Sequence, residues 1–425
     1  MRQRYQRTGK KSKRNFEVVG GRELAVRMPL PLAEFWEELQ AEVERLTGEV
    51  GLGILRAILE DEVTRRVGPP YRPDPASGAR RWGRQPGYVV FGGQKIPLER
   101  PRVRTRGGEE VELDTYGRLQ QDGRMQRAVA ERVVCGLSTR KYRRAVEAVL
   151  DGYGIARSSV SRHFVRATAH QLRELCERRL EKLSLVALLI DGIEFAGQTL
   201  IVALGVDENG RKHVLGLWQG ATENATVGKA LLDDLVARGL DPERRYLFVL
   251  DGSKALRAAV DKVFGAQAEV QRCPLHKRRN VTDHLPEHCR ADYDRQLRNA
   301  YAMSSYPDAK QALERIWRQL CDVNPSAARS LEEGMEETLT LHRLGVSPLL
   351  RRSLASTNII ESCLSTVRHV ARNVKRWQGG DHIARWTAAG LLEAEKKFRK
   401  LKGHQELKAL GEKLNPGLHS QEQVA

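Results

Sequence analysis

The middle of the chain alternates short apolar runs with turn sequences, and this pattern constrains the fold more than any other feature. Three runs come first, at 184–190, 198–206 and 213–219. Helical periodicity follows at about 222–238 and at 254–264, and each of these stretches precedes another apolar run, "YLFVL" and then "AEVQRC". The pattern predicts an antiparallel meander continued by two further strands and two helices, which is an α/β fold built on a mixed sheet.

The regions around this sheet are predicted to be helical. Beyond Cys273 the chain carries helical periodicity almost to its end. We predict seven segments: a basic flexible arm (1–27), an N-terminal basic DNA-binding or dimerisation module (28–120), a helix-turn-helix-like region (121–180), the first part of a catalytic core (181–276), an all-helical insertion (277–350), the final core helices (351–412) and a tail (413–425).

The N-terminal segments are strongly basic. Seven Lys or Arg and one Glu occur in the first twenty residues, which predicts a mobile arm. Amphipathic helices are predicted at 32–46 and 51–67. Between Arg65 and Arg106 there are eleven basic and two acidic residues, with strand-like pieces such as "GYVVFG". A small basic module containing β-structure is therefore predicted there.

The stretch 136–167 has the pattern of a helix-turn-helix. Ser138 or Thr139 can cap a first helix, and Ser158 or Ser159 can cap a second. That second helix carries Arg162, His163 and Arg166, whose outward face could meet a major groove. A structural helical hairpin with solvated arginines is an equal alternative.

The charge balance identifies a class of partner. The 425 residues contain 72 Lys+Arg and 54 Asp+Glu, a net charge of +18, which predicts an anionic polymer as partner. Aromatic residues make up only 6%, so double-stranded DNA is favoured over a single strand held by stacking. Six irregularly spaced cysteines indicate a reducing compartment, and no apolar run is long enough to span a bilayer. We therefore expect a cytoplasmic protein with no membrane partner.

Two carboxylates share one setting. Asp191 and Asp251 are each expected to end an apolar strand, and each precedes a glycine. If the two strands are parallel neighbours, both side chains lie at one edge of the sheet. Two close carboxylates repel each other unless a cation lies between them, and Mg²⁺ prefers such oxygen ligands. Asp-Gly is also a common turn dipeptide, so either residue alone could be a turn.

A third carboxylate is expected downstream, and the stretch 354–377 supplies Glu361. If Asn358 caps a helix, Glu361 lies in its first turn, and Arg368 and Arg372 continue the same face. The alternative is a plain helix cap without chemistry. Other acidic residues are less suitable. Neither Glu194 nor Asp207 ends an apolar strand, and the pattern "LEEGMEETL" indicates a solvated acidic helix face for Glu332, Glu333, Glu336 and Glu337.

Together these motifs resemble one known family. "LLIDG", "LFVLDGSKAL", "QRCPLHKRRN", "STNIIES" and "RNVKRW" match in order and spacing the Mutator-type bacterial insertion-sequence transposases over roughly residues 130–400. The resemblance implies a ribonuclease-H-like catalytic core interrupted by a helical insertion. It also implies that Asp191, Asp251 and Glu361 are the catalytic triad and bind Mg²⁺, for which Mn²⁺ can substitute.

The resemblance further implies residues that contact DNA. Cys273 and His276 form the family's Cys-x-x-His signature, and Trp377 would stack on distorted DNA. With the basic residues already named and those beside Trp377, the predicted DNA-binding set is Arg162, Arg166, Cys273, His276, Arg368, Arg372, Lys375, Arg376 and Trp377. Structural zinc at Cys273 and His276 is the disfavoured alternative, because "HLPEHC" is not a standard second half of a zinc site.

The resulting hypothesis is a DNA transposase that binds the terminal inverted repeats of its own element and cleaves and joins DNA strands with Mg²⁺. Since two DNA ends must be handled together, a homodimer is expected, associated with the bacterial nucleoid when bound to DNA. The alternatives are a non-catalytic DNA-binding regulator with a nuclease-like core and a zinc-linked interaction protein.

Overall fold

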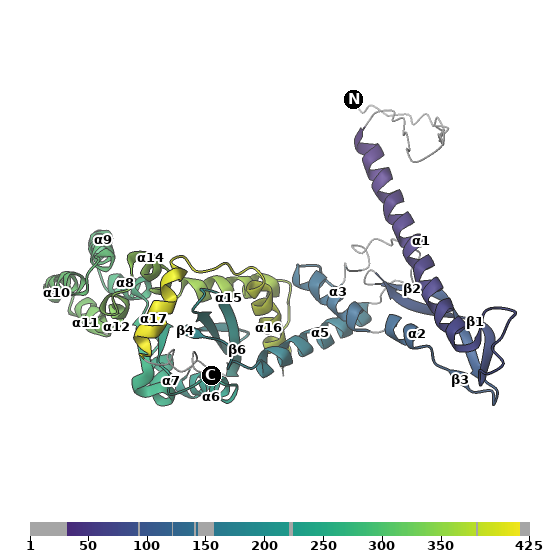
Figure 1. Ribbon diagram of the computed structural model, residues 1–425. Coiled ribbons are helices and arrows are strands. Elements are labelled where there is room, and N and C mark those ends of the chain that lie inside the picture. The colour runs from purple at the N-terminus through teal and green to yellow at the C-terminus, as the bar shows by residue number, and fades with distance from the viewer. Residues whose placement is uncertain are drawn as a thin grey trace, which may run out of the picture. The chain divides into compact units, whose positions relative to one another are not determined.

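The computed structural model describes residues 32–91, 94–120, 122–139, 142, 157–220, 224–379 and 381–416 (Figure 1). The chain divides into two compact units, with the division at about residue 121. Each unit is described by itself below.

The N-terminal unit is a long helix packed on a small antiparallel sheet. The strands lie in the order β1-β2-β3. Its elements are α1 (Leu32–Val67), β1 (Ala79–Phe91), β2 (Gln94–Thr105), β3 (Glu110–Val111) and α2 (Asp114–Leu119). The basic β-containing module predicted from the sequence is therefore present, so this unit combines helices with a sheet, whereas the described helices of the region predicted at 121–180 are Asp122–Val134 and Arg157–Glu177.

The two helices predicted at 32–46 and 51–67 are one helix in the structure. No proline occurs within the 36 residues of α1, and Gly48, Gly51 and Gly53 weaken a helix without breaking it. Leu59 and Val63 of α1 are fully buried against the sheet, where Val103 of β2 is also fully buried. The sheet thus supports α1 from Leu52 to Val67, and no proline interrupts the helix before that stretch.

The C-terminal unit is organised by a five-stranded mixed sheet. The strand order is β6-β5-β4-β7-β8, in which β4, β5 and β6 pair antiparallel and β7 and β8 continue parallel to β4. The strands are β4 (Leu185–Phe195), β5 (Gln198–Asp207), β6 (Lys212–Gly220), β7 (Tyr246–Leu250) and β8 (Ala268–Arg272). The predicted strands and their order along the chain are confirmed.

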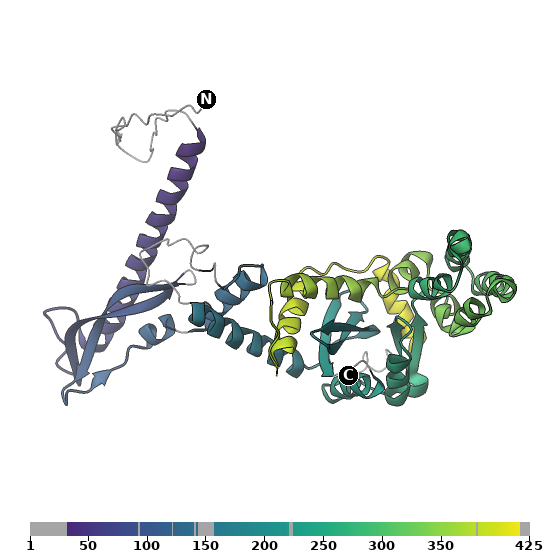
Figure 2. The same ribbon diagram turned by 180° about the vertical axis from the view of Figure 1, so that it is seen from behind.

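Helices cover both faces of this sheet (Figures 1 and 2). Alternate residues of β4 point to opposite faces, so Leu188 and Ile190 join one apolar core and Ala187 and Leu189 the other. The first core includes α6 (Ala225–Ala237) and α7 (Lys254–Phe264). The second includes α15 (Asn358–Ala371), α16 (His382–Glu395) and α17 (Leu407–Leu414). Burial on both faces explains why β4 is a continuous apolar run.

The chain between β8 and α15 is helical throughout, as the sequence predicted for 277–350. Much of it packs around a separate apolar core. Its helices are α8 (Pro274–Asp283), α9 (Glu287–Ala302), α10 (Tyr306–Val323), α11 (Pro325–Glu332), α12 (Met335–Thr338), α13 (Thr340–Arg343) and α14 (Pro348–Leu354). Two 3₁₀ turns, Gly265–Gln267 and His404–Glu406, lie elsewhere in the unit.

The predicted helix-turn-helix is only partly within the described residues. Its second helix corresponds to α5 (Arg157–Glu177), which packs against α3 (Asp122–Val134) and α16. The segment of the proposed first helix and turn lies largely outside the described residues. No helix in the described ranges is long and apolar enough to cross a membrane.

Buried cations fasten the helices to one another. Arg238, at the end of α6, donates to the carbonyl oxygens of Leu175 (3.1 Å), Arg178 (3.1 Å) and Leu215 (2.8 Å). Arg351 of α14 donates to the carbonyl oxygens of Met303 and Ser304 at the end of α9, at 2.8 and 3.1 Å. Except for the Leu215 carbonyl in strand 212–220, these acceptors lie at or just beyond helix ends, which leave carbonyl groups without partners.

His342 should make the stability of this unit depend on pH. Burial, and then the charge of Arg351, lower the pKa of His342 to about 4. Because an unfolded histidine titrates near 6.5, the unfolded chain binds more protons between these values, and stability falls as pH falls from about 6.5 to 4. Between pH 7.5 and pH 5, wild type should lose about 2 kcal/mol more in the free energy of unfolding than His342→Gln loses, because the variant has no histidine to titrate at this position.

The measurement is urea denaturation at both pH values, wild type against His342→Gln. His170→Gln is the matched control, because His170 is exposed on α5 and only a surface pair joins it to Glu174. An equal pH dependence in wild type and His342→Gln would contradict the prediction.

Candidate active site

The register between β4 and β7 brings Asp191 and Asp251 together. The last paired residues of these parallel strands are Leu189 and Val249. Two residues further along each chain lie Asp191 and Asp251, and parallel neighbours are about 4.8 Å apart. The two carboxylates therefore share the edge of the sheet at which β7 ends.

One expectation about Asp191 was wrong. It does not end its strand, since β4 continues to Phe195. The reason is that β5 pairs with β4 on its other side through Phe195↔Gln198, so the strand persists after β7 has stopped. The amide of Gly192 donates to Asp191 Oδ1 at 2.8 Å, and the residue is half-buried.

Asp251 does follow the end of its strand. Its Oδ1 accepts a hydrogen bond from the Ser253 amide at 2.8 Å, which folds the chain into a turn. Gly252 has φ of 112°, a conformation that favours glycine. Ser253 then caps α7 by accepting from the Leu256 amide at 3.3 Å. Asp251 is thus a turn residue, and it is also a carboxylate at the edge of the sheet, so the turn and the proposed site do not exclude each other.

Glu361 lies in the first turn of α15, but the cap differs from the prediction. The N-cap residue is Thr357 instead of Asn358. Thr357 is fully buried, and its hydroxyl donates to Glu361 Oε1 at 2.5 Å. Ile360, Cys363 and Val367 bury the opposite side of α15 in the core beneath β4. Packing therefore fixes the helix, and the hydroxyl fixes the carboxylate.

Cys273 and His276 meet the same hydroxyl. Cys273 follows β8 and is fully buried, and His276 lies in the first turn of α8. Thr357 Oγ1 lies 3.3 Å from His276 Nδ1 and 3.6 Å from Cys273 Sγ. His276 Nε2 lies 3.9 Å from Glu361 Oε1. The start of α8 and the start of α15 are thus joined through one threonine side chain.

The electrostatics of His276 connect it to two of the three carboxylates. Its hydrogen bond with Cys273 is the largest cause that raises its pKa, and the charges of Glu361 and Asp251 raise the pKa further. Burial alone would raise the pKa of the Cys273 thiol, yet hydrogen bonds from His276 and Thr357 lower it overall. His276 is therefore biased toward the imidazolium form, with Asp251 and Glu361 in its neighbourhood.

The chemistry of the three carboxylates fits a hard divalent cation. Asp191, Asp251 and Glu361 offer only oxygen ligands, which Mg²⁺ prefers, and none is fully buried. Within the described ranges, no three His, Cys, Asp or Glu side chains are gathered closely enough to hold a metal ion as they stand.

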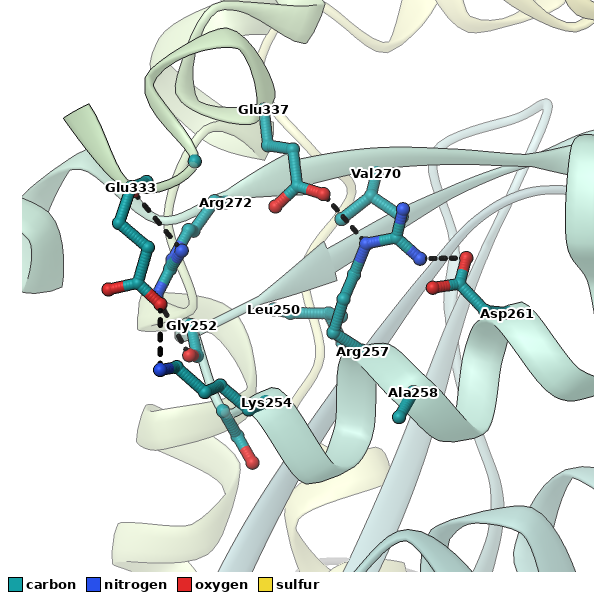
Figure 3. A pocket seen from close by; sticks show the side chains of 12 residues that line it. Leu250, Gly252, Lys254, Arg257, Ala258, Asp261, Val270, Arg272, Glu333 and Glu337 are labelled. Carbon is teal, nitrogen blue, oxygen red and sulfur yellow. Dashed lines mark hydrogen bonds and ion pairs between the residues drawn. The ribbon is translucent and has the colours of Figure 1, made fainter.

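A cavity of about 410 Å³ lies beside the Asp251 turn (Figure 3). Arg272 donates to the carbonyl oxygens of Gly252 at 2.9 Å and Glu333 at 3.3 Å, and it is largely buried. Across the cavity, Arg257 bridges Glu337 and Asp261. Arg272 thus links the turn that carries Asp251 to the segment between α11 and α12.

Lys277 makes a second link to that segment. Its ammonium donates to the carbonyl oxygens of Ser330 and Glu333, each at 2.6 Å, and burial lowers its pKa to about 8. The sequence analysis missed Thr357, Arg272 and Lys277. Each is adjacent to a residue that was singled out, but nothing in the sequence marks a cation or a hydroxyl as buried.

The predicted DNA-binding residues fall into two groups. Arg162 and Arg166 are exposed on α5, whereas His163 beside them is buried, which corrects its expected outward position. Arg368 is exposed on α15, and Arg372 is the exposed C-cap residue of this helix and donates to the His369 carbonyl at 2.7 Å. Lys375 and Arg376 are exposed just after it. The two groups lie on different helices of the unit.

Trp377 is half-buried and packs on protein side chains. Its ring centroid lies 5.0 Å from that of Phe195, at the end of β4, and 5.5 Å from that of His382. The structure therefore places Trp377 close to the strand that carries Asp191. Its stacking on DNA stays a prediction.

Comparison with known proteins identifies the class to which this fold and site belong. The family model described as "Transposase, Mutator family" matches residues 36–400. The chain belongs to the Mutator family of transposases.

Its relatives are insertion-sequence transposases. The chain is 29% identical over 367 residues to the transposase for insertion sequence element ISRM5 of Rhizobium meliloti, covering 82% of this chain and 88% of the relative. It is 27% identical over 276 residues to the transposase for IS905 of Lactococcus lactis, covering 63% and 67% of the two chains. The transposase for IS406 of Burkholderia multivorans is 24% identical over 327 residues, covering 74% and 81%.

Replacing Arg272 should destabilise the C-terminal unit. Arg272→Met removes the side-chain donor to the Gly252 carbonyl and one of the two side-chain donors to the Glu333 carbonyl, the other being Lys277, and we expect a loss of about 2 kcal/mol in the free energy of unfolding. Lys254→Met is the control, because Lys254 also contacts Glu333, at 3.3 Å, but its side chain is 84% exposed. Urea denaturation followed by circular dichroism measures both. Equal effects of the two substitutions would show that Arg272 is not a link between the segments.

Proposed function

We propose that this protein is a DNA transposase of the Asp-Asp-Glu type, which binds the terminal inverted repeats of its element and catalyses Mg²⁺-dependent strand cleavage and strand transfer. The observation that carries the proposal is the β4–β7 register, which aligns Asp191 with Asp251. Glu361 is the third member, because its Oε1 lies 3.9 Å from His276 Nε2 and the charges of both Glu361 and Asp251 raise the pKa of His276.

We also propose that the sheet is the ribonuclease-H-like core implied by the sequence resemblance. In support, three antiparallel strands are followed by two strands parallel to the first, in the order β6-β5-β4-β7-β8. The helical stretch from α8 to α14 separates this sheet from α15, which carries Glu361. This is the arrangement expected of a core with a helical insertion.

In this proposal Asp191, Asp251 and Glu361 hold Mg²⁺, and Mn²⁺ can replace it. Two such ions, when bound, would supply the positive charge that lowers the pKa of an attacking water or 3′-hydroxyl group and stabilises the leaving oxygen of a phosphodiester. Thr357 orients the Glu361 carboxylate. His276, in its cationic form, offers positive charge to the DNA phosphate near the carboxylates.

The remaining cations bind the DNA backbone. Arg368 and Arg372 extend from Glu361 along the exposed face of α15, and Lys375 and Arg376 follow. Guanidinium groups bind phosphates in a bidentate manner, so this face can hold a strand that enters the site. We propose that Arg162 and Arg166 on α5 contact terminal-repeat DNA, and that Cys273 acts through His276.

Two copies of the protein would handle the two ends of the element. A homodimer follows from the proposed reaction, because both inverted repeats and the target DNA must be held together. The expected location is the bacterial cytoplasm, at the nucleoid when the protein is bound to DNA.

The first prediction concerns the three carboxylates. On a labelled duplex that carries the element's end, we expect Asp191→Asn, Asp251→Asn and Glu361→Gln each to reduce Mg²⁺-dependent cleavage by roughly 10²-fold or more, because each removes a metal ligand and keeps the side-chain shape. Binding of the duplex should change little. Cleavage should also stop in EDTA.

Glu194→Gln is the matched control, since Glu194 is an exposed carboxylate three residues beyond Asp191 on β4. Normal cleavage by any one of the three variants would remove that residue from the triad. Duplex binding without cleavage by the wild-type protein, on single and on paired ends, would favour a DNA-binding regulator.

The second prediction concerns the hydroxyl of Thr357. Thr357→Val keeps the shape but leaves Glu361 Oε1 without its donor, and we expect the cleavage rate at saturating DNA to fall by about 10-fold. Thr357→Ser should recover most of the rate, because it restores the hydroxyl. Thr366→Val, on the same helix, should cleave normally, since the Thr366 hydroxyl contacts only the Ser362 carbonyl at 3.3 Å. Failure of Thr357→Ser to exceed Thr357→Val would assign Thr357 to packing alone.

A further inference from the structure

One face of the N-terminal sheet gathers arginines around an exposed tryptophan. Arg80 of β1 lies directly opposite Arg104 of β2 in the register of the two strands. Both guanidinium groups lie over the ring of Trp82, at 4.7 and 5.0 Å from its centroid. Trp82 is 42% exposed. We call Arg80, Trp82 and Arg104 the arginine–tryptophan cluster.

Glu110 lies opposite Arg104 in the register of β2 and β3, and the charge of Arg104 helps to lower the pKa of Glu110, but Glu110 forms its ion pairs with other arginines. On β3, Glu110 bonds to Arg100 at 3.0 Å and to Arg102, and its hydrogen bond with Arg102 is the largest cause that lowers its pKa. Of the described residues, none forms a carboxylate ion pair with Arg80 or Arg104. Like charges directly opposite each other destabilise a sheet, so this pair has a cost that an anionic partner would offset.

Another arginine of the same strand shows the contrast. Arg81 donates to Glu60 and, at 2.8 Å, to Thr64, both on α1, and it also bonds to the Gly68 carbonyl at 3.1 Å. Its hydrogen-bonding capacity is used within the protein. Arg80 and Arg104 instead stack on Trp82, which restricts their rotamers; Arg80 is exposed, and Arg104 is half-buried with an Nε that has no hydrogen-bond partner among the described residues.

We propose that the arginine–tryptophan cluster binds the phosphate backbone of duplex DNA, independently of its sequence. The inference rests on the proposed function, in which DNA is the partner. Two planar guanidinium groups held on one aromatic ring suit neighbouring phosphate oxygens. Contacts to phosphates position a protein on DNA but carry no sequence information, so the cluster should act equally on any duplex.

The test measures how DNA affinity depends on salt. Binding of the full-length protein is followed by fluorescence anisotropy across a salt series, with a duplex that carries the element's end and with a scrambled duplex of equal length. Each phosphate contact contributes about 0.9 to the slope of log Kobs against log salt concentration. The double variant Arg80→Gln, Arg104→Gln should therefore lower that slope by about 1.8 on both duplexes.

Two further variants make the result specific. Arg65→Gln, on α1, should leave the slope nearly unchanged, because Arg65 pairs with Asp61 at 2.8 Å. The variant Arg80→Lys, Arg104→Lys keeps the charge and should retain most of the slope. If the glutamine pair fails to fold, the single variants Arg80→Gln and Arg104→Gln replace it; each should lower the slope by about 0.9, and an unchanged slope in both would overturn the inference.

The outcomes separate this inference from the proposed function. If wild type binds and cleaves the end duplex and the folded glutamine pair has an unchanged slope, the inference is wrong and the proposed function stands. If wild type neither binds nor cleaves, both fail. The same salt series is also run with an RNA duplex of the same sequence. If the glutamine pair lowers the slope on the RNA duplex but not on the DNA duplexes, the assignment to DNA is wrong.

Discussion

The parallel pairing of β4 with β7 is the constraint on which the rest of the site depends. Without it, Asp191 and Asp251 would be sixty positions apart in sequence with no reason to meet. The pairing requires both strands to be buried on both faces, and the helices on each side provide that burial. Since slipping the register by one residue would reverse the face of every side chain, the two cores hold the carboxylates in line.

The third carboxylate is positioned by a different kind of interaction. Glu361 comes from a helix that begins after the whole α8–α14 stretch, so strand pairing cannot fix it. Its position depends on the apolar face of α15 and on the buried Thr357 hydroxyl, which also reaches Cys273 and His276. Buried hydroxyl groups in proteins usually have hydrogen-bond partners, and the partners of the Thr357 hydroxyl are residues of the candidate site.

The sequence predicts the sheet well because its signals are local. Each of the five strands is a short apolar run, and the helix at 254–264 agrees with α7 at both ends. The errors arise where a neighbour decides the outcome. Asp191 stays within a strand because β5 continues beside it. The two helices predicted at 32–46 and 51–67 are one because no proline lies between them and glycine alone does not end a helix.

The candidate site shows the same division. The three carboxylates, Cys273 and His276 could be singled out from motifs, because Asp191 follows a run of apolar strand residues and the others stand just after a strand or in the first turn of a helix. Thr357, Arg272 and Lys277 could not, since their roles depend on which carbonyl or carboxylate lies opposite in space. The burial of His163 could not be foreseen either, because one turn of α5 places exposed arginines on both sides of it.

The positive charges of the chain therefore have two distinct roles that composition cannot separate. Arg238, Arg272, Lys277 and Arg351 are buried and donate to backbone carbonyl groups, so they hold helices in place and are unavailable to an anion. Arg80, Arg104 and Arg368 have no such role among the described residues. The net charge of +18 therefore overstates the number of cations that could contact DNA. An arginine beside a helix end donates to carbonyl groups of the protein. An arginine stacked on an exposed ring is the kind proposed here to bind a phosphate.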